Sequence, residues 1–483
     1  MNLNKCSCGA FTTAEDGICA DCVYIQNYEE DIDDTKDIKN ILNIENIKNI
    51  ENIEITDEIK EALDLMENTN ESAFVTGPAG TGKTTLQKCF RKHTKKKVLV
   101  VAATGLAALN AGGQTIHSVF RLPPQFLTKS DVEKVYGTSL FKTIGAIAIE
   151  EVSMVRADML DAIDLFMRLN GKNSNLPFGG VQLLLFGDLY QMPPVVDSEC
   201  SKLIGRFYET PYFFSANVMK NFTLKKIELN KVFRQKDLEF INFLRKVRLG
   251  NISESDLEYI NSRACNIKPT DDYVTLTPTN SIVSSINQKK LSELPDKLYT
   301  YMGRVEGKFD LGNNSSKNNN LPADFELRLK KGAKVMFVKN DSQGRWVNGT
   351  LGKIEELGDN FVKVRIDDDS FVVEVGAETW EKIKQEYDEV SNKIIAKVIG
   401  KYIQIPLKLA WALTIHKAQG QTLDKTYIDL SSGVWESGHT YVALSRCRTL
   451  NGIILKNKIS LSDIKVDRRI AEFFKNKFSD NMG

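Results

Sequence analysis

The segment GPAGTGKT, residues 77–84, combines three glycines with a lysine and two threonines. It follows the apolar AFVT and precedes TLQKCFRKH, so the pattern indicates a strand, a loop and a helix. This pattern is typical of a phosphate-binding loop, in which backbone N–H groups face the phosphates, Lys83 reaches the β and γ phosphates, and the Thr84 hydroxyl ligates Mg²⁺. The candidate nucleotide contacts are Gly77, Pro78, Ala79, Gly80, Thr81, Gly82, Lys83, Thr84 and Thr85.

The segment IAIEEVSM, residues 147–154, ends an apolar run in two adjacent carboxylates, Glu150 and Glu151. Two like charges at the edge of a core are costly unless a ligand uses them. A strand beside a phosphate loop should end in one acid that holds Mg²⁺ and one that polarises the attacking water. We therefore predict that Glu150 and Thr84 hold Mg²⁺ and that Glu151 is the general base. Two solvated carboxylates after a strand are the alternative.

Three further side chains could complete a hydrolytic site. Gln191, in LFGDLYQMPPV, could hydrogen-bond the γ-phosphate or the attacking water. Arg234, in NKVFRQKD, and Arg446, in TYVALSRCR, could neutralise the charge that develops on a transferred phosphate when a cleft closes. For either arginine alone, a surface ion pair is the competing interpretation.

The segments ATGLAALNAGGQTIHSVF, LTPTN and LTIHKAQGQT each follow or end an expected strand. They offer short hydroxyl, amide and imidazole groups, which suit phosphate contacts along a single nucleic-acid strand. A satisfied core histidine is the competing interpretation for each of the two histidines. The candidate contacts are Thr104, Thr115, His117, Thr279, Asn280, Thr414, His416 and Lys417.

Alternating strands and helices must position these groups. TDEIKEALDLMEN begins with a threonine cap and has apolar residues at helical spacing. AFVTG, KKVLVVAAT, IGAIAIEE and VQLLLFGD are typical of buried parallel strands, and YVTLTPTN, TYIDL and GIILK belong to a second alternating region. Between about 300 and 398, the short strands AKVMFVKN, NFVKVRI and SFVVEV predict a small β-barrel inserted in the second α/β domain.

The composition is that of an ordinary soluble protein, with 483 residues, 42% hydrophobic and 26% charged. No apolar run approaches the roughly 20 residues of a membrane span, and the N-terminus lacks the pattern of a signal peptide, so we expect a cytoplasmic protein that does not bind membranes. Residues 1–56 are acidic and the remainder is mildly basic, which is compatible with a polyanionic partner.

Four cysteines lie in the N-terminal CSCGAFTTAEDGICADC. Pairs spaced in this way can place four thiolates around structural Zn²⁺, whereas disulfides do not suit the expected compartment. We therefore predict a zinc ribbon at residues 1–24 and an acidic low-complexity linker at residues 25–56. The expected zinc ligands are Cys6, Cys8, Cys19 and Cys22.

In this order, the motifs resemble those of the PIF-type DNA helicases of the RecD-like branch of superfamily 1, especially the bacterial and phage forms. The similarity runs from about residue 55 to 475 and includes GPAGTGKTT, GGQTIHSVF, VFRQKD, VMFVKNDSQGRWVNGT and HTYVALSRCR. It implies an α/β fold with two RecA-like P-loop domains, at residues 57–225 and 226–483, and ATP in the cleft between them. It also implies a wedge at about 121–138 and an SH3-like identity for the barrel at about 300–398.

By the same resemblance, the protein would be a monomeric, ATP-dependent 5′-to-3′ helicase on single-stranded and forked DNA, acting in replication, recombination or repair. Gly420 is counted among the nucleotide contacts. The N-terminal segment could bind DNA or a replication or recombination protein, or could only add stability.

Three departures from the family pattern matter. Glu150 stands where family members usually have Asp, residues 57–71 contain no Gln to read adenine, and the cysteine-rich start lies outside the similarity. We expect activity to survive the first departure, because the general-base position Glu151 is unchanged. The second interpretation is an ATP-regulated clamp on single-stranded DNA, with little turnover because of Glu150. The third is the translocating subunit of a recombination nuclease, and RNA substrates also stay open.

Overall fold

The computed structural model describes residues 55–136, 140–265, 269–307, 321, 323–339, 341, 343, 345–346, 350–366, 371–388 and 393–478, with two short strands near the N-terminus. These two strands, β1 (Asn4–Lys5) and β2 (Phe11–Thr12), pair antiparallel. The predicted zinc ligands Cys6, Cys8, Cys19 and Cys22 and the linker up to residue 54 lie outside the described residues. No helix in the described ranges has the length and hydropathy of a membrane span.

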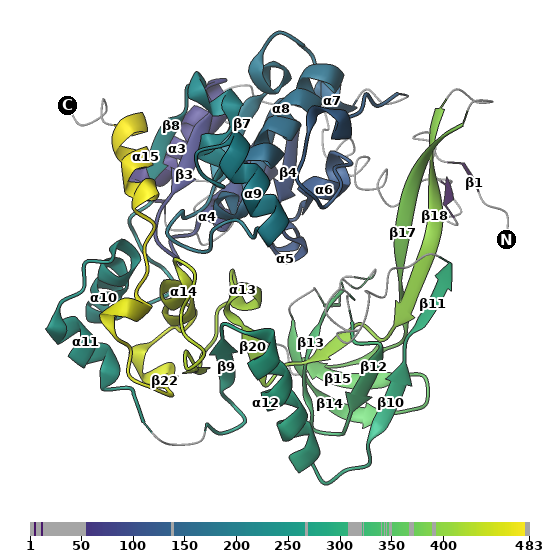
Figure 1. The fold of residues 1–483 in the computed structure, drawn as a ribbon, viewed down its shortest axis with the longest axis vertical. Helices are drawn as coiled ribbons and strands as arrows, with labels where there is room; N and C mark the ends of the chain where they lie inside the picture. Colours follow the sequence, from purple (N-terminus) through teal and green to yellow (C-terminus); the bar gives the residue numbers. More distant parts are fainter. Residues whose placement is uncertain are drawn as a thin grey trace. The chain divides into compact units, whose positions relative to one another are not determined.

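The chain folds into two compact units, and the first is built on a six-stranded parallel sheet (Figure 1). Each central strand runs parallel to both of its neighbours, and the central strands are almost completely buried. A parallel sheet with both faces covered explains why these strands are nearly continuous apolar runs. The strands lie in the order β5 (Gln114–Thr115), β4 (Val98–Ala102), β6 (Ala146–Glu150), β7 (Gln182–Phe186), β3 (Ala73–Thr76) and β8 (Lys225–Glu228).

Alternate residues of each strand point to opposite faces of this sheet. Because these residues are mostly apolar, helices pack on the sheet and bury them. On one face, Ala73 and Val75 of β3 share a core with α3 (Asp57–Asn68) and α4 (Lys83–His93). The Thr56 hydroxyl caps α3 by accepting from the Ile59 N–H, as the sequence predicts. The unit also contains α5 (Gly105–Asn110), α6 (Ile116–Val119), α7 (Leu140–Thr143), α8 (Ala157–Asn170) and α9 (Ser198–Phe207).

The C-terminal helix α15 (Arg468–Phe478) belongs to the first unit. Its Phe474 stacks on Phe74 of β3 with ring centroids 6.1 Å apart, and its Phe473 stacks on Phe214 at 4.3 Å. The predicted boundary at residue 225 therefore differs from the observed division. The first unit runs to Lys231, except for Tyr190–Met192, and also includes the chain from Arg468 onward. Strand β8 completes the sheet beside β3, and the apolar face of α15 covers that sheet.

The second unit has a four-stranded parallel sheet in the order β20, β9, β21, β22. The neighbours of β9 on both sides run parallel to it, which is the pattern expected for a second α/β domain. The strands are β20 (Ala412–Thr414), β9 (Val274–Thr277), β21 (Thr426–Ile428) and β22 (Ile453–Leu455). The helices are α10 (Leu238–Leu249), α11 (Glu254–Asn261), α12 (Asn280–Glu293), α13 (Ile415–Ala418) and α14 (His439–Ser445).

An antiparallel region lies within this unit, between α12 and β20 in the sequence. Its five-stranded sheet has the order β16 (Val372–Val375), β15 (Val362–Ile366), β14 (Leu351–Leu357), β13 (Lys334–Phe337) and β19 (Leu407–Leu409). The remaining strands are β10 (Tyr299–Met302) with β12 (Glu326–Leu329), and β11 (Arg304–Gly307) with the hairpin β17 (Glu378–Asp388) and β18 (Lys393–Gln404). The expected strands correspond to β13, β15 and β16, and the region extends as far as β19.

Helix α8 offers a direct test of the core of the first unit. Phe166 is 1% exposed and its ring lies 4.8 Å from that of Phe141 and 5.2 Å from that of Phe120. Phe166→Ala should lower the free energy of unfolding by about 3–5 kcal/mol, because it leaves a cavity in a packed aromatic cluster. Leu169→Ala, at a 42% exposed position on the same helix, should change it by less than about 1 kcal/mol. Urea unfolding followed by circular dichroism measures both, and equal losses would contradict this description of the core.

Candidate active site

The phosphate loop connects β3 to α4 through a sharply curled backbone. Gly77, Gly80 and Gly82 have φ values of 146°, 81° and 84°. A Cβ added at Gly77 would lie 2.3 Å from the Leu229 carbonyl oxygen, so only glycine fits there. Because α4 begins at Lys83, the curled loop ends at a helix N-terminus, where N–H groups and the helix dipole favour an anion.

The Lys83 ammonium group lies within this loop. Its Nζ donates to the carbonyl oxygens of Gly77 and Pro78 at 2.8 and 2.9 Å. The Thr81 hydroxyl donates to the same Pro78 oxygen at 2.9 Å and braces the turn. The positive charge is therefore held next to the backbone N–H groups that would face a phosphate.

The structure brings Thr84 and Glu150 together, as the sequence predicts. Thr84 is in the first turn of α4, and its hydroxyl donates to Glu150 Oε2 at 3.1 Å. Glu150 ends β6, and one strand, β7, lies between β6 and β3 in the sheet. The two side chains still meet because the carboxyl ends of parallel strands lie at one edge of a sheet.

Glu150 is 3% exposed, and its Oε1 has no hydrogen-bond partner within the described part of the chain. Burial and, next to it, the charge of Glu151 raise the pKa of its carboxyl group to about 8, although the Thr84 hydrogen bond and the Lys83 charge oppose this rise. A buried carboxylate with one oxygen unpaired, beside a hydroxyl, is a donor set that suits a hard divalent cation such as Mg²⁺. The residues present therefore fit the predicted magnesium site.

Glu151 adopts a left-handed backbone conformation, with φ 49° and ψ 48°. Such a conformation costs about 1–3 kcal/mol in a non-glycine residue and persists where the surrounding structure enforces it. The turn after Glu151 is tightly packed, since a Cβ added at Gly187 would lie 2.9 Å from the Val152 nitrogen. Gly187 follows β7 and has no side chain, so its backbone can lie close to Val152. This contact holds the turn next to Glu151, the predicted general base.

Gln191 and the two arginines belong to the second unit. Gln191 is buried. Its backbone carbonyl oxygen would lie 2.3 Å from a Cβ added at Gly438, so the two backbones are in close contact. Arg446 is 1% exposed and donates to Val442 O at 2.9 Å and to Ser445 Oγ at 2.8 Å. Arg234 donates to the Ser445 carbonyl oxygen at 3.1 Å.

Both arginines therefore contact the end of α14, and their roles as charge-neutralising groups stay predictions. Sequence reasoning did not identify Gln235, which is 2% exposed and whose Nε2 donates to the carbonyl oxygens of Ser445 and Cys447 at 3.2 and 2.9 Å. Gly420, the predicted nucleotide contact of this unit, has φ 81° in the turn after α13.

The predicted DNA contacts of the first unit lie at the carboxyl ends of two neighbouring strands. Thr104 follows β4 and accepts from the Ala107 N–H at 3.3 Å. Thr115 ends β5 and caps α6 by accepting from the Ser118 N–H at 3.2 Å. His117 forms a 3.0 Å hydrogen bond with Leu122 O, and burial lowers the pKa of its imidazole.

The second unit repeats this arrangement. Thr279 and Asn280 follow β9 at the start of α12, and Thr414 ends the neighbouring β20. The Thr414 hydroxyl caps α13 by accepting from the Lys417 N–H at 3.4 Å. His416 also lies on α13, so the candidate contacts of this unit gather at one edge of its sheet.

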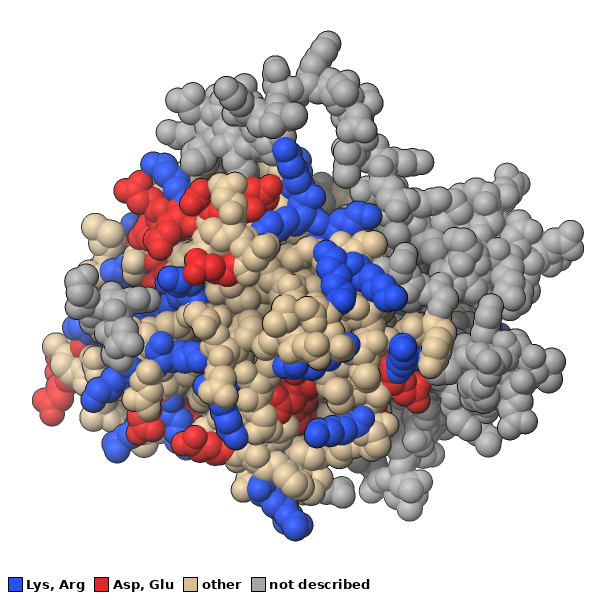
Figure 2. All heavy atoms as spheres, turned by 90° about the horizontal axis from the view of Figure 1, so that it is seen from above, with Lys and Arg blue, Asp and Glu red and all other residues tan. Residues whose placement is uncertain are grey.

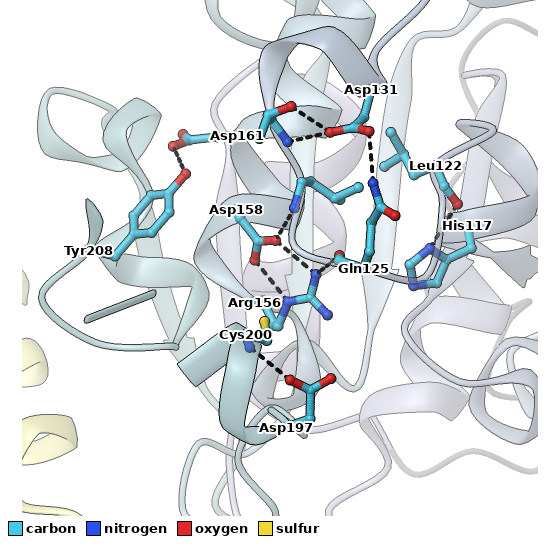
Figure 3. Close-up of polar contacts among 12 residues, drawn as sticks. His117, Leu122, Gln125, Asp131, Arg156, Asp158, Asp161, Asp197, Cys200 and Tyr208 are labelled. Atoms are coloured by element: carbon cyan, nitrogen blue, oxygen red, sulfur yellow. Dashed lines mark hydrogen bonds and ion pairs between the residues drawn. The ribbon is translucent and has the colours of Figure 1, made fainter. Parts of the chain in front are cut away.

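The segment predicted to be a wedge is anchored to α8 by buried polar groups (Figure 3). Asp158, 1% exposed, accepts from the Leu127 N–H at 2.8 Å and from Arg156 Nε at 2.9 Å. Arg156 also donates to Gln125 O at 2.5 Å. Neither charged residue is predicted from the sequence, because an Arg-x-Asp pair at a helix start does not by itself reveal a distant loop.

Charge alone does not single out a nucleic-acid surface on the face shown in Figure 2. Acidic side chains gather toward the upper left of the described atoms, while basic ones spread over the rest. The case for nucleic acid therefore depends on the motifs and on comparison with known proteins.

Two family models match the chain. PIF1-like helicase matches residues 48–258, and the 2B domain of the DNA helicase Pif1 matches residues 313–357. The chain is 30% identical over 437 residues to the ATP-dependent DNA helicase Pif1 of Campylobacter jejuni, covering 84% of this chain and 94% of that protein. It is 32% identical to human ATP-dependent DNA helicase PIF1, covering 84% of this chain but only 61% of that longer protein.

Solved structures give the same result. The structure of Bacteroides Pif1 bound to ssDNA is similar with a TM-score of 0.75 and 35% identity, covering 89% of this chain and 98% of that one. Pif1 helicase from Candida albicans matches with a TM-score of 0.73 and 30% identity, covering 88% and 99%. On these similarities, and on the phosphate loop and paired acids at the edge of its first sheet, the chain belongs to the PIF1-like helicase family.

Proposed function

We propose that the protein is an ATP-dependent DNA helicase that moves 5′ to 3′ along single-stranded DNA and separates forked duplexes. The observation that carries this proposal is the contact between Thr84 and the buried Glu150 beside a glycine-rich phosphate loop. The names of the relatives and the Bacteroides Pif1 structures with ssDNA and with ADP-AlF3 support the nucleotide and the DNA substrate.

In this proposal, Mg²⁺ would be held by the Thr84 hydroxyl and by Glu150, and it would neutralise charge on the β and γ phosphates of ATP. Lys83 would exchange its hydrogen bonds to Gly77 and Pro78 for bonds to these phosphates. Glu151 would polarise the attacking water. The strained backbone at Glu151 supports this role, because strain of this kind concentrates at functional sites.

DNA would be gripped through its phosphates by the small polar groups at the carboxyl edges of the two sheets, which are Thr104, Thr115, His117, Thr279, Asn280, Thr414, His416 and Lys417. Nucleotide binding and hydrolysis would make the two units grip the DNA strand in alternation. This alternation would give directed steps. Because the contacts are mainly to the backbone, binding should be sensitive to salt and largely independent of sequence.

Several finer assignments belong to the same proposal. The match to the Pif1 2B domain and the five-stranded antiparallel sheet support an SH3-like insert within the second of two RecA-like domains. The anchoring of Leu127 by Asp158 supports a wedge that resists the oncoming duplex. Strands β1 and β2, on either side of Cys6 and Cys8, support a zinc ribbon, in which Cys19 and Cys22 complete the ligand set. We propose a monomer as the working form.

One observation favours the clamp as a second candidate function. With a pKa of about 8, the Glu150 carboxyl is largely protonated at neutral pH in the metal-free protein. If Mg²⁺ fails to displace that proton, the chain would bind ATP and DNA with little turnover.

Mg²⁺ binding should depend on pH through Glu150. A carboxyl with a raised pKa must lose its proton before it can bind the cation, so apparent Mg²⁺ affinity with a non-hydrolysable ATP analogue should fall as pH decreases below 8, by up to about tenfold per unit. Calorimetric Mg²⁺ titrations at pH 7 and pH 9 measure this change.

Glu150→Gln should bind Mg²⁺ weakly at both values and lose the pH dependence. Glu472→Gln, which changes an exposed carboxylate on α15, should behave like the original protein. An Mg²⁺ affinity that is the same at both pH values in the unmodified protein would be evidence against a protonated Glu150.

Directional unwinding tests the proposed function as a whole. Matched duplexes with a 5′ or a 3′ single-stranded tail should differ, so that only the 5′-tailed duplex is unwound with ATP. Glu151→Gln should lower ATP hydrolysis at least about 100-fold, because a general base contributes at least that factor, while ATP and DNA binding persist. Strand separation measured by fluorescence reports the first result and phosphate release reports the second.

Three outcomes distinguish the candidate functions. Unwinding of the 3′-tailed duplex alone would reverse the proposed polarity. No unwinding of either duplex, with both ligands still bound, would favour the clamp. Full activity of Glu151→Gln would exclude this residue as the general base.

A further inference from the structure

Three side chains that bear metal-ligating atoms converge in the second unit. His416 lies on α13, Glu436 lies in the loop before α14, and His439 is the first residue of α14. Glu436 Oε2 is 3.1 Å from His416 Nε2 and 3.6 Å from His439 Nε2. The three ligand atoms all lie within 4.8 Å of one another, which is the only such group of three among the described residues.

His439 gives a second, independent observation. It is 0% exposed, and neither ring nitrogen has a hydrogen-bond partner in the described ranges. Leaving a buried polar group unpaired is destabilising, so a hydrogen-bonded pair of His416 and Glu436 alone does not account for this residue.

We propose that His416, Glu436 and His439 bind a divalent transition-metal ion, with Zn²⁺ as the cation of choice. Two imidazole nitrogens and one carboxylate oxygen suit zinc, with a fourth position left for water. Ligand atoms of a tetrahedral zinc ion lie about 3.4 Å apart, which is close to the observed 3.1 and 3.6 Å. The two histidine nitrogens lie within 4.8 Å of each other and would reach the same spacing by side-chain rotation. Cation binding would also satisfy the buried His439 nitrogen.

The site would tie α13 to the start of α14. Helix α13 has only four residues, so its own hydrogen bonds hold it weakly. It carries Lys417, and its cap is Thr414, two of the candidate DNA contacts. A metal ion bound here would order these groups. Because it would occupy His416 Nε2, this inference replaces the DNA contact proposed above for His416 and leaves that role to Thr414 and Lys417. This inference goes beyond the proposed function, and metal binding can be measured without any helicase activity.

The test is a Zn²⁺ titration of the full chain against a chromophoric chelator. Because the N-terminal cysteines could also bind zinc, the titration uses a background in which these four residues are changed to Ser. Glu436→Gln and His439→Gln remove the proposed ligands one at a time. His93→Gln is the matched control, since His93 lies on α4 and outside the cluster. The background carries the substitutions Cys6→Ser, Cys8→Ser, Cys19→Ser and Cys22→Ser.

Trp435 gives an internal optical signal for the same site. Its ring centroid is 5.2 Å from that of His439, and the side chain is 53% exposed. Ni²⁺, which quenches nearby indole fluorescence, should therefore quench Trp435, and Trp435→Phe should remove that quenching.

We expect one equivalent of Zn²⁺ per chain in the serine background and in His93→Gln. The affinity should fall at least about tenfold in Glu436→Gln and in His439→Gln, since losing even an outer-shell partner of a metal costs that much. No bound zinc in the serine background, or unchanged affinity in His439→Gln, would overturn the proposal. If a variant fails to fold, as judged by circular dichroism, the zinc count and the Ni²⁺ quenching of the serine background decide the question.

Discussion

The contact between Thr84 and Glu150 is the constraint on which the candidate active site depends. It joins the first turn of α4 to the end of β6, although β7 separates β6 from β3. Glu150 can be buried there only if a proton or a cation neutralises it, which its raised pKa reflects. Nucleotide-bound Mg²⁺ would supply that charge, so the same burial that destabilises the carboxylate prepares it to bind metal.

Close backbone approaches hold the rest of this site in place. Gly77 lies against the Leu229 carbonyl and Gly187 against the Val152 nitrogen, with no room for a side chain at either position. The first contact places the phosphate loop, and the second sets the turn that carries Glu151. Interiors packed in this way resist small displacements, so these contacts limit how far the two acids can move.

The second unit uses the carboxyl edge of its parallel sheet in a different way. Thr414 caps the short α13, and the proposed metal ligands lie on that helix and beside α14. Arg234, Gln235 and Arg446 are held around the end of the same α14 by hydrogen bonds. One seven-residue helix therefore connects the proposed metal ligands to the candidate charge-neutralising groups.

The sequence by itself determined the phosphate loop, the acid pair and the alternating strands, because spacing along the chain encodes local backbone form. It also predicted that Thr84 and Glu150 meet. Only the tertiary structure placed β7 between their strands, returned α15 to the first unit and paired Asp158 with Leu127. Strand order, the packing of a C-terminal amphipathic helix and the burial of His439 beside Glu436 depend on contacts between distant residues, which local spacing does not encode.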